Sequence, residues 1–491
     1  MHVVFIAAEC EPFAKTGGLA DVVDALARAL GHVPGGLAEP VEIFLPRYRG
    51  LATPAGAAVA TRIVRVPDPF APGGRTEAAI RTVAADGYRL RLVDVPEAFD
   101  RFGYYGDVAG DFSDNEWRFG LLCRSALEAR RDEGRPIDVL AVHDWHACPA
   151  VLQRDLAYAA DPIVGRAAAV LTVHNPAYHG WIPRDRSVGL GLGIAGEAVG
   201  DAWGVDLLAE GIRRAELVNT VSPGYAREIL GPERGMGLDP DLRARGDRFL
   251  GILNGLDTAL WDPATDGALA APYDRQDRSG KAACRSDLLA RLAMDPSDPG
   301  PVIGVIGRLD PQKGFDLVAA AAARLVARGI RLVVLGSGDA ALVDAARAVA
   351  ARRPDRLALV ERFDRDLARR IYAGADLFLM PSRFEPCGQG QMIALRYGTP
   401  PIARRTGGLA DSIVDLGEAP AAGTGFLFDR ATPAGLIAAV GRAVAVYADP
   451  DRSRWEGLVE RGMAVDFAWE SGSARAYLDA YRRAIALRRA G

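Results

Sequence analysis

The feature that most constrains the fold of this chain is a repeated alternation of short apolar strands, glycine-bearing loops and amphipathic helices. Residues 2–8 predict a buried strand, and the turn at 17–18 leads into a helix whose apolar residues recur every three or four positions from Leu19 to Leu30. Such alternation is typical of parallel sheets with helices on both faces. We therefore expect an α/β fold.

The second half of the chain repeats this scheme. Strands are predicted at 302–306, 331–335, 377–380 and 425–428, with a glycine-bearing loop at 307–314 and a helix from 315 to about 328. A β-rich segment, with strands at 61–66 and 88–93, spans residues 51–93.

A length of 491 residues suits two domains of about 200 or more residues each. We predict a first domain of residues 1–249 and a second of residues 250–467, because a new unit starts near Gly251. The remaining segment, 468–491, contains an amphipathic helix that we expect to return to the first domain.

The hexapeptide Thr-Gly-Gly-Leu-Ala-Asp occurs at 16–21 and again at 406–411, after Lys15 and Arg405 respectively. We interpret both copies as loop-to-helix turns whose backbone N–H groups and helix dipoles hold anions or sugar hydroxyls at a shared cleft. Two ordinary tight turns are the alternative.

Composition limits the functional classes. The net charge of −4, with both signs mixed along the chain, gives no reason to expect a nucleic-acid partner. The five cysteines stand singly, without metal-site spacing, which fits a reduced compartment. With no signal-like N-terminus and no apolar run of 18 residues, we expect a cytoplasmic protein without a membrane partner.

Lysine is scarce. Of 59 basic residues only Lys15, Lys281 and Lys313 are lysines. An ammonium is a compact point charge that fits against a phosphate where a guanidinium does not. Lys15 and Lys313 follow predicted strands in glycine-bearing loops and are candidates for that role, whereas Lys281 is compatible with chance.

Eight motifs follow one another along nearly the whole chain. They are ECEPFAKTGGLAD at 9–21, HDWH at 143–146, HNPAYHG at 174–180, TVSP at 220–223, LNGLD at 253–257, GRLDPQKG at 307–314, RFEPCG at 383–388 and RRTGGL at 404–409. In this order they closely resemble the bacterial glycogen synthase and plant starch synthase family.

The resemblance implies a GT-B fold, in which two Rossmann-like domains with parallel sheets face each other across a deep cleft. It also implies a retaining hexosyltransferase that moves glucose from ADP-glucose to the non-reducing end of an α-1,4-glucan such as glycogen. UDP-glucose is the alternative donor. The nucleotide-sugar is a substrate, so neither a cofactor nor a metal is expected.

A diphosphate leaving group requires positive charge that is in place before the reaction. Arg308 and Lys313 lie five residues apart in a loop that opens a helix, so both can reach one diphosphate, and Lys15 would reach it from the other domain. Glu385 would bind sugar hydroxyls or stabilise an oxocarbenium-like centre. The resemblance implies that His174 contacts the transferred glucose. These five residues are the expected catalytic group.

The expected substrate-binding residues lie in the same motifs. They are Glu9, Thr16, Gly17, Gly18, Asp21, Asp144, Asn175, Asn254, Cys387, Gly388, Gln389, Gly390, Thr406, Gly407 and Gly408. The family usually carries Thr where this chain has Gly390, so backbone N–H groups at Gln389 and Gly390 would hold the distal phosphate.

The sequence leaves several alternatives open. The histidines at 143, 146, 174 and 179 could hold a metal, but residues that line a cleft fit their spacing better, and His146 is expected to form structural hydrogen bonds. A pyridoxal-phosphate phosphorylase would need Lys281 as its Schiff base. A non-catalytic nucleotide-sugar sensor is a further alternative. A dinucleotide oxidoreductase is disfavoured, because G-x-G-x-x-G does not follow the first strand.

Two mechanisms retain the anomeric configuration. Double displacement needs a carboxylate nucleophile under the anomeric carbon, and the sequence nominates none. We therefore favour front-face displacement.

Overall fold

The computed structural model describes residues 1–51 and 59–490, which divide into two compact units. Unit 1 comprises Met1–Gly255 and the segment that begins at Trp469, and unit 2 comprises Leu256–Ala468. The division falls after residue 255 rather than after residue 249, because Phe249–Gly251 forms strand β13 of the unit 1 sheet.

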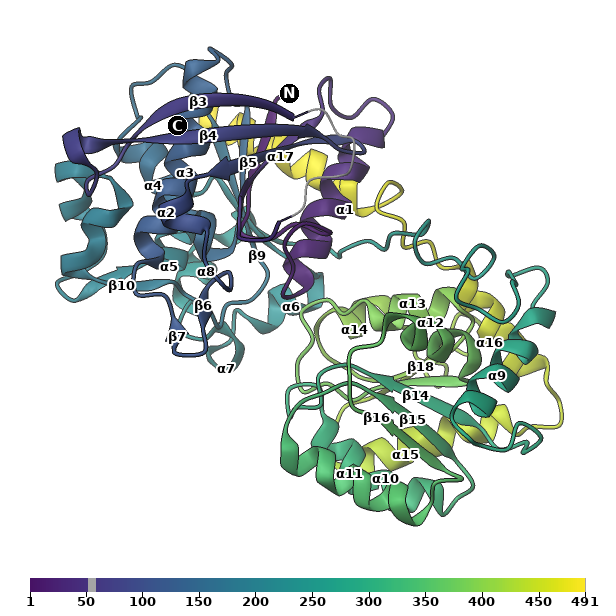
Figure 1. The fold of residues 1–491 in the computed structure, drawn as a ribbon. Coiled ribbons are helices and arrows are strands. Elements are labelled where there is room, and N and C mark those ends of the chain that lie inside the picture. The colour runs from purple at the N-terminus through teal and green to yellow at the C-terminus, as the bar shows by residue number, and fades with distance from the viewer. Residues whose placement is uncertain (52–58, 491) are drawn as a thin grey trace. The chain divides into compact units, whose positions relative to one another are not determined.

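The sheet of unit 1 has the strand order β13-β12-β9-β8-β1-β2-β5-β4-β3. Strands β3, β4, β5 and β9 of this sheet are labelled in Figure 1. The strands before β13 are β1 (Val3–Ile6), β2 (Val41–Pro46), β3 (Val59–Pro67), β4 (Arg75–Ala84), β5 (Tyr88–Asp94), β8 (Val139–His143), β9 (Ala168–Val173) and β12 (Leu217–Thr220). Strand β4 pairs antiparallel with β3 and β5, whereas the pairings from β5 to β13 are parallel.

The predicted strands at 61–66 and 88–93 lie within β3 and β5. Strand β4 between them was not predicted, and residues 52–58 of the predicted β-rich segment lie outside the described residues.

Helices cover the sheet of unit 1. The main ones are α1 (Gly18–His32), α3 (Asn115–Asp132), α4 (Asp144–Leu156), α5 (Leu207–Arg214), α6 (Pro223–Glu228) and α17 (Ser473–Ala490). Helix α17, yellow in Figure 1, packs on β8, β9 and α1. The Asn219 side chain donates a hydrogen bond to the Tyr477 hydroxyl of α17 at 3.0 Å. The last helix is therefore part of unit 1.

The sheet of unit 2 is parallel, with the order β16-β15-β14-β17-β18-β19. Its strands are β14 (Val302–Ile306), β15 (Arg331–Leu335), β16 (Leu357–Val360), β17 (Leu377–Met380), β18 (Pro401–Arg404) and β19 (Phe426–Phe428), and its helices are α9 (Ser279–Arg291), α10 (Phe315–Val326), α11 (Ala340–Arg352), α12 (Arg365–Gly374), α13 (Gly390–Arg396), α14 (Gly407–Ser412), α15 (Pro433–Tyr447) and α16 (Ser453–Ala464). The predicted strands and the predicted helix of this half are confirmed, with ends that differ by at most a few residues.

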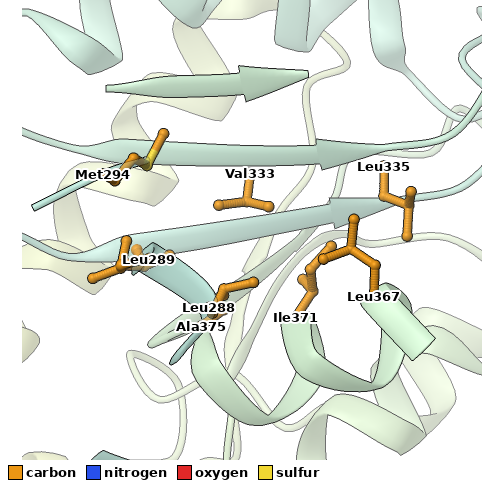
Figure 2. Close-up of a cluster of buried hydrophobic side chains, with 9 residues drawn as sticks. Leu288, Leu289, Met294, Val333, Leu335, Leu367, Ile371 and Ala375 are labelled. Atoms are coloured by element: carbon orange, nitrogen blue, oxygen red, sulfur yellow. The ribbon is translucent and has the colours of Figure 1, made fainter. Parts of the chain in front are cut away.

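Side chains of α9 and α12 form a core with one face of the unit 2 sheet (Figure 2). Leu367 and Ile371 of α12 pack with Val333 and Leu335 of β15. Burying each such side chain contributes about 1.5–3 kcal/mol. A Cβ at Gly304 would come within 2.5 Å of Ile371, so the absence of a side chain at 304 lets α12 approach β14 closely.

Both sheets reverse their strand order at one point, between β1 and β8 in unit 1 and between β14 and β17 in unit 2. Loops that leave the carboxyl ends of such strands diverge, and open α/β sheets bind ligands there. Among the described residues, no helix combines the length and apolar character needed to cross a bilayer.

Candidate active site

A cavity of about 150 Å³ lies in unit 2 at the carboxyl ends of β14 and β17, where the strand order reverses. Both strands and the loops that follow them contribute to its lining. The lining residues that the sequence analysis selected are Arg308, Lys313, Glu385, Gly388, Gln389 and Gly390. The structure therefore brings together residues that are separated by more than 70 positions in the chain.

The loop that carries Arg308 is fixed by close backbone packing. Leu309 exchanges two backbone hydrogen bonds of 2.9 Å with the loop that follows β15. A Cβ at Gly336 would come within 1.8 Å of the Gly307 carbonyl oxygen, and Gly336 has a φ of 154°, so this approach requires glycine. The Arg308 side chain is 65% exposed and pairs with Asp310 at 2.9 Å. Its guanidinium is therefore accessible to a ligand in the cavity.

Lys313 forms an ion pair with Glu385 in the cavity lining. The Nζ atom donates hydrogen bonds to Oε1 and Oε2 of Glu385 at 2.8 and 2.7 Å. Glu385 is buried, and its Oε2 also accepts a hydrogen bond from Ser382 Oγ at 2.9 Å. Because a buried carboxylate without a partner is costly, each charge holds the other in place. A bound anion would share the lysine with this carboxylate.

The second copy of the hexapeptide packs on the segment that carries Glu385. The Gly408 N–H donates a hydrogen bond to the Glu385 carbonyl at 3.1 Å, and a Cβ at Gly407 would come within 2.1 Å of that oxygen. Thr406 and Cys387 are both buried beside it. The Gly408 N–H is therefore engaged within the protein rather than offered to a ligand, and this loop positions Glu385.

In unit 1 the predicted residues gather at the carboxyl ends of β1, β8 and β9, again where the strand order reverses. Those that follow β1 are Glu9, Lys15, Thr16, Gly17, Gly18 and Asp21, whereas Asp144 follows β8, and His174 and Asn175 follow β9.

The buried carboxylate of Glu9 occupies the start of helix α1. It accepts hydrogen bonds from the Thr16 N–H at 2.5 Å, the Thr16 hydroxyl at 2.6 Å and the Gly17 N–H at 3.1 Å. The Tyr105 hydroxyl also donates to it, at 2.5 Å. The first hexapeptide was expected to offer these N–H groups to a ligand, and the structure corrects this. A carboxylate of the chain itself takes the position that favours an anion.

Lys15 lies beside this turn. Its Nζ is 2.6 Å from Oδ1 of Asp21 and 3.4 Å from Oε2 of Glu11, and the side chain is 37% exposed. A Cβ at Gly17 or Gly18 would meet no atom within 4 Å. The ammonium is therefore held by acids of its own unit, next to open space.

Asp144 begins helix α4 with a φ of 57°, a backbone conformation that residues other than glycine rarely adopt. Its Oδ1 accepts a hydrogen bond from the backbone N–H of His174 at 2.7 Å. Burial raises the pKa of the Asp144 carboxyl to about 7. Strained backbone and a perturbed pKa together are typical of functional positions.

His143 and His174 form an imidazole pair, with Nδ1 of His143 3.1 Å from Nε2 of His174. Burial lowers the pKa of His174 to about 3 and that of His143 well below its ordinary value. Both rings are therefore uncharged at neutral pH, and one of the two nitrogens donates to the other. The site around His174 is suited to uncharged hydroxyl groups.

The other two histidines do not join this pair. His146 packs against Trp145 and Tyr105, with ring centroids 4.0 and 4.7 Å away, and its buried Nδ1 has no partner in the described part of the chain. Ring packing surrounds His146, and the described residues supply no partner for the hydrogen bond expected of its Nδ1. His179 pairs with Asp206 at 2.5 Å. Over residues 1–51 and 59–490, no group of three or more His, Cys, Asp or Glu side chains is arranged to hold a metal.

Asn254 is the remaining predicted site residue of unit 1. It follows β13, and its N–H donates a hydrogen bond to the carbonyl of Val221 at 3.3 Å. Its buried Oδ1 has no partner among the described residues.

Sequence reasoning missed two tyrosines at these sites, Tyr105 beside Glu9 and Tyr372 in the lining of the unit 2 cavity. The Tyr105–Glu9 contact spans 96 positions, and neither tyrosine stands in a recognisable motif. No local pattern could have identified them.

Comparison with known proteins gives matches along nearly the whole chain. The family model of the starch synthase catalytic domain matches residues 2–244, and that of glycosyl transferases group 1 matches residues 300–445. A glycogen synthase of Anaeromyxobacter dehalogenans (strain 2CP-1) is 42% identical, over 97% of this chain and 98% of its own. A glycogen synthase of Syntrophotalea carbinolica is 38% identical over 100% of both chains.

Solved structures agree. The catalytic domain of starch synthase IV from Arabidopsis thaliana, bound to ADP and acarbose, is similar with a TM-score of 0.87 and 33% identity over 99% of both chains. Sucrose-phosphate synthase from Thermosynechococcus elongatus has a TM-score of 0.58 at 18% identity over 99% of both chains, a likeness of fold alone.

Proposed function

Because the chain belongs to the glycogen synthase and starch synthase family of GT-B glycosyltransferases, we propose that it moves glucose from ADP-glucose to the non-reducing end of an α-1,4-glucan with retention of configuration. The observation that carries the proposal is the unit 2 cavity, which combines Arg308 with the Lys313–Glu385 pair.

This cavity has the charges that a nucleotide-sugar requires. Arg308 and Lys313 would hold the diphosphate, and Glu385 would accept hydrogen bonds from hydroxyl groups of the glucose. The ADP bound to starch synthase IV favours adenine over uracil as the donor base. The neutral His174 and the adjacent Asp144 of unit 1 would contact glucose hydroxyls and the acceptor.

The reaction would proceed by front-face displacement. The bond between the anomeric carbon and the β-phosphate oxygen breaks, and the acceptor O4 attacks from the same side. The O4 proton passes to the departing phosphate, so that ADP leaves as the new glycosidic bond forms. Arg308, Lys313 and Lys15 would stabilise the charge that develops on the diphosphate.

The environment of Lys281 favours a synthase over a pyridoxal-phosphate phosphorylase. Its Nζ donates hydrogen bonds to the carbonyls of Ala373 at 2.9 Å and Tyr397 at 3.0 Å, and to Thr399 Oγ1 at 2.7 Å. A Schiff base needs a free amine. Three acceptors around one ammonium also give a structural reason for lysine at position 281, which the sequence alone left compatible with chance.

The experiment that tests the proposal compares ADP-glucose and UDP-glucose as donors with glycogen as acceptor, and follows the anomer of the first product by NMR. We expect turnover with ADP-glucose to exceed that with UDP-glucose, and an α-1,4 linkage in the product. Transfer from neither donor by protein that binds ADP would instead support the sensor alternative.

A further inference from the structure

The unit 2 cavity extends beneath Gly390, the first residue of α13. A Cβ at Gly390 would lie 3.1 Å from Phe378 Cε1, 3.3 Å from Met380 Sδ and 3.3 Å from the Tyr372 hydroxyl oxygen. The resemblance described in the sequence analysis implies Thr at this position, where this chain has Gly. A side chain at this position would therefore meet the Tyr372 hydroxyl as well as Phe378 and Met380.

Tyr372 is held rigidly in the cavity lining. Its ring packs against Phe378, Trp261 and Tyr397, with centroids 4.9, 5.8 and 6.2 Å away. Its carbonyl accepts a hydrogen bond from Thr399 Oγ1 at 2.6 Å. A ring enclosed on several sides keeps its hydroxyl at a defined place without further ordering when a ligand binds.

The hydroxyl of Tyr372 is available to a ligand. The residue is 5% exposed, and within residues 1–51 and 59–490 its hydroxyl makes no hydrogen bond. Because Tyr372 lines the cavity, its hydroxyl can bind a ligand there without giving up a hydrogen bond within the protein. Burial raises the pKa of Tyr372 above its ordinary value, so the group carries its proton and is a donor at neutral pH.

We infer that the Tyr372 hydroxyl donates a hydrogen bond to the terminal phosphate of a nucleoside diphosphate in this cavity, in place of the hydroxyl that residue 390 lacks. The inference rests on the proposed function, because it takes the nucleotide-sugar as the ligand. Lys313 lines the same cavity, so the phosphate would receive one neutral and one charged donor. Tyr372 is thus a donor-binding residue that the motifs do not reveal.

The test is calorimetric binding of ADP and AMP to the full chain and to Tyr372→Phe. The variant removes one oxygen atom that has no protein partner, so its melting temperature should match that of the parent. We expect ADP binding to weaken about tenfold, as is typical when a hydrogen bond to a charged group is lost. AMP, which lacks the terminal phosphate, should bind the two proteins equally.

Two further variants sharpen the test. Tyr397→Phe removes the hydroxyl of a neighbouring ring, which binds Asp266 at 2.7 Å and does not line the cavity, and should leave ADP affinity unchanged. Gly390→Ser in the Tyr372→Phe background returns a hydroxyl to the cavity and should recover most of the lost affinity.

Equal ADP affinity of the parent and Tyr372→Phe would overturn the inference, as would an equal loss for ADP and AMP. If Gly390→Ser did not recover ADP affinity in the Tyr372→Phe background, the Tyr372 hydroxyl would not stand in for a hydroxyl at residue 390. If the parent bound ADP no better than AMP and transferred no glucose, the proposed function would fail as well. If the parent transferred glucose normally and Tyr372→Phe bound ADP unchanged, this inference alone would fail.

Discussion

The two units place their site residues at the same point of an α/β sheet but use different chemistry there. In unit 2, Arg308 and Lys313 line a cavity in which the buried acid Glu385 already has a cationic partner. In unit 1, His174 is uncharged, and burial moves the pKa of Asp144 to about 7. The first arrangement is suited to a charged diphosphate, and the second to uncharged sugar hydroxyls.

The two copies of the hexapeptide show the same contrast. The first closes on the carboxylate of Glu9, and the second packs on the backbone carbonyl of Glu385. Identical sequences at the starts of helices thus position a glutamate in each unit. A helix start predicts a preference for negative charge, but whether a ligand or the chain supplies that charge depends on distant residues such as Tyr105.

The largest expected effect comes from removing the unit 2 ammonium. Lys313→Ala should lower kcat/KM by two or more orders of magnitude, because one contact to a developing charge contributes about 3–4 kcal/mol. Steady-state kinetics with ADP-glucose and glycogen measures this. The exposed Arg324→Ala on helix α10 removes a charge from the same unit and should have no effect.

Lys313 also neutralises the buried Glu385, so its removal should cost about 1–3 kcal/mol of unfolding free energy. Kinetics must therefore be measured well below the melting temperature of the variant. If folded Lys313→Ala kept nearly the activity of the parent, Lys313 would not stabilise the diphosphate leaving group.

Exchanging the basic residue that precedes each hexapeptide should affect activity at the first copy but not at the second. Lys15→Arg keeps the charge but replaces a compact ammonium with a planar fork beside Asp21. We expect kcat to fall about tenfold with a modest change in ADP affinity, because Lys15 would contact the diphosphate mainly in the transition state. Arg405→Lys, at the equivalent position before the second copy, pairs with Glu418 and Asp429 on the surface and should change little. Equal activity of Lys15→Arg and the parent would contradict the argument from lysine scarcity.

The unit 1 groups predict opposite effects of pH on stability. Asp144 has a raised pKa, so the native state binds its proton more tightly than the unfolded state, and its contribution to stability falls between about pH 4 and pH 7. His174 has a lowered pKa, so its contribution is lost as the pH falls from about 6.5 towards 3.

Asp144→Asn should therefore remove the part of the unfolding free energy that falls as the pH rises from 4 to 7. The unfolding free energy of the variant minus that of the parent should become more positive over this range. Urea unfolding at several pH values measures this difference. If this difference did not vary with pH, the raised pKa of the buried Asp144 carboxyl would be contradicted. As a control, replacing the partly exposed Asp138 in Asp138→Asn should give a difference that varies little.

The smallest expected effect is that of chelation. Adding EDTA should leave glucose transfer nearly unchanged, because Arg308 and Lys313, which line the cavity, would supply the positive charge at the diphosphate. Complete loss of activity that Mg²⁺ or Zn²⁺ restores would revive the metal interpretation of the histidines.

The sequence was sufficient to predict the α/β architecture, because strands buried on both faces, such as Val302–Ile306, read as unbroken apolar runs. Arg308, Lys313 and Glu385 were predicted because each follows a predicted strand within a family-like motif, and the structure then shows that these two strands are neighbours. Contacts made by side chains from distant segments were not predictable. Glu9 filling the α1 turn, Lys281 binding two helix ends and Tyr372 beneath Gly390 all depend on packing that no local pattern encodes.

The central claim is that Lys313 of unit 2 would hold the charged diphosphate, whereas the uncharged His174 of unit 1 would contact sugar hydroxyls. The most direct test is calorimetric ADP affinity for Lys313→Ala and His174→Ala, together with turnover of both. The account predicts that Lys313→Ala weakens ADP binding about tenfold or more, whereas His174→Ala keeps ADP affinity within about twofold and still loses turnover. Parental ADP affinity in Lys313→Ala together with a large loss in His174→Ala would contradict it.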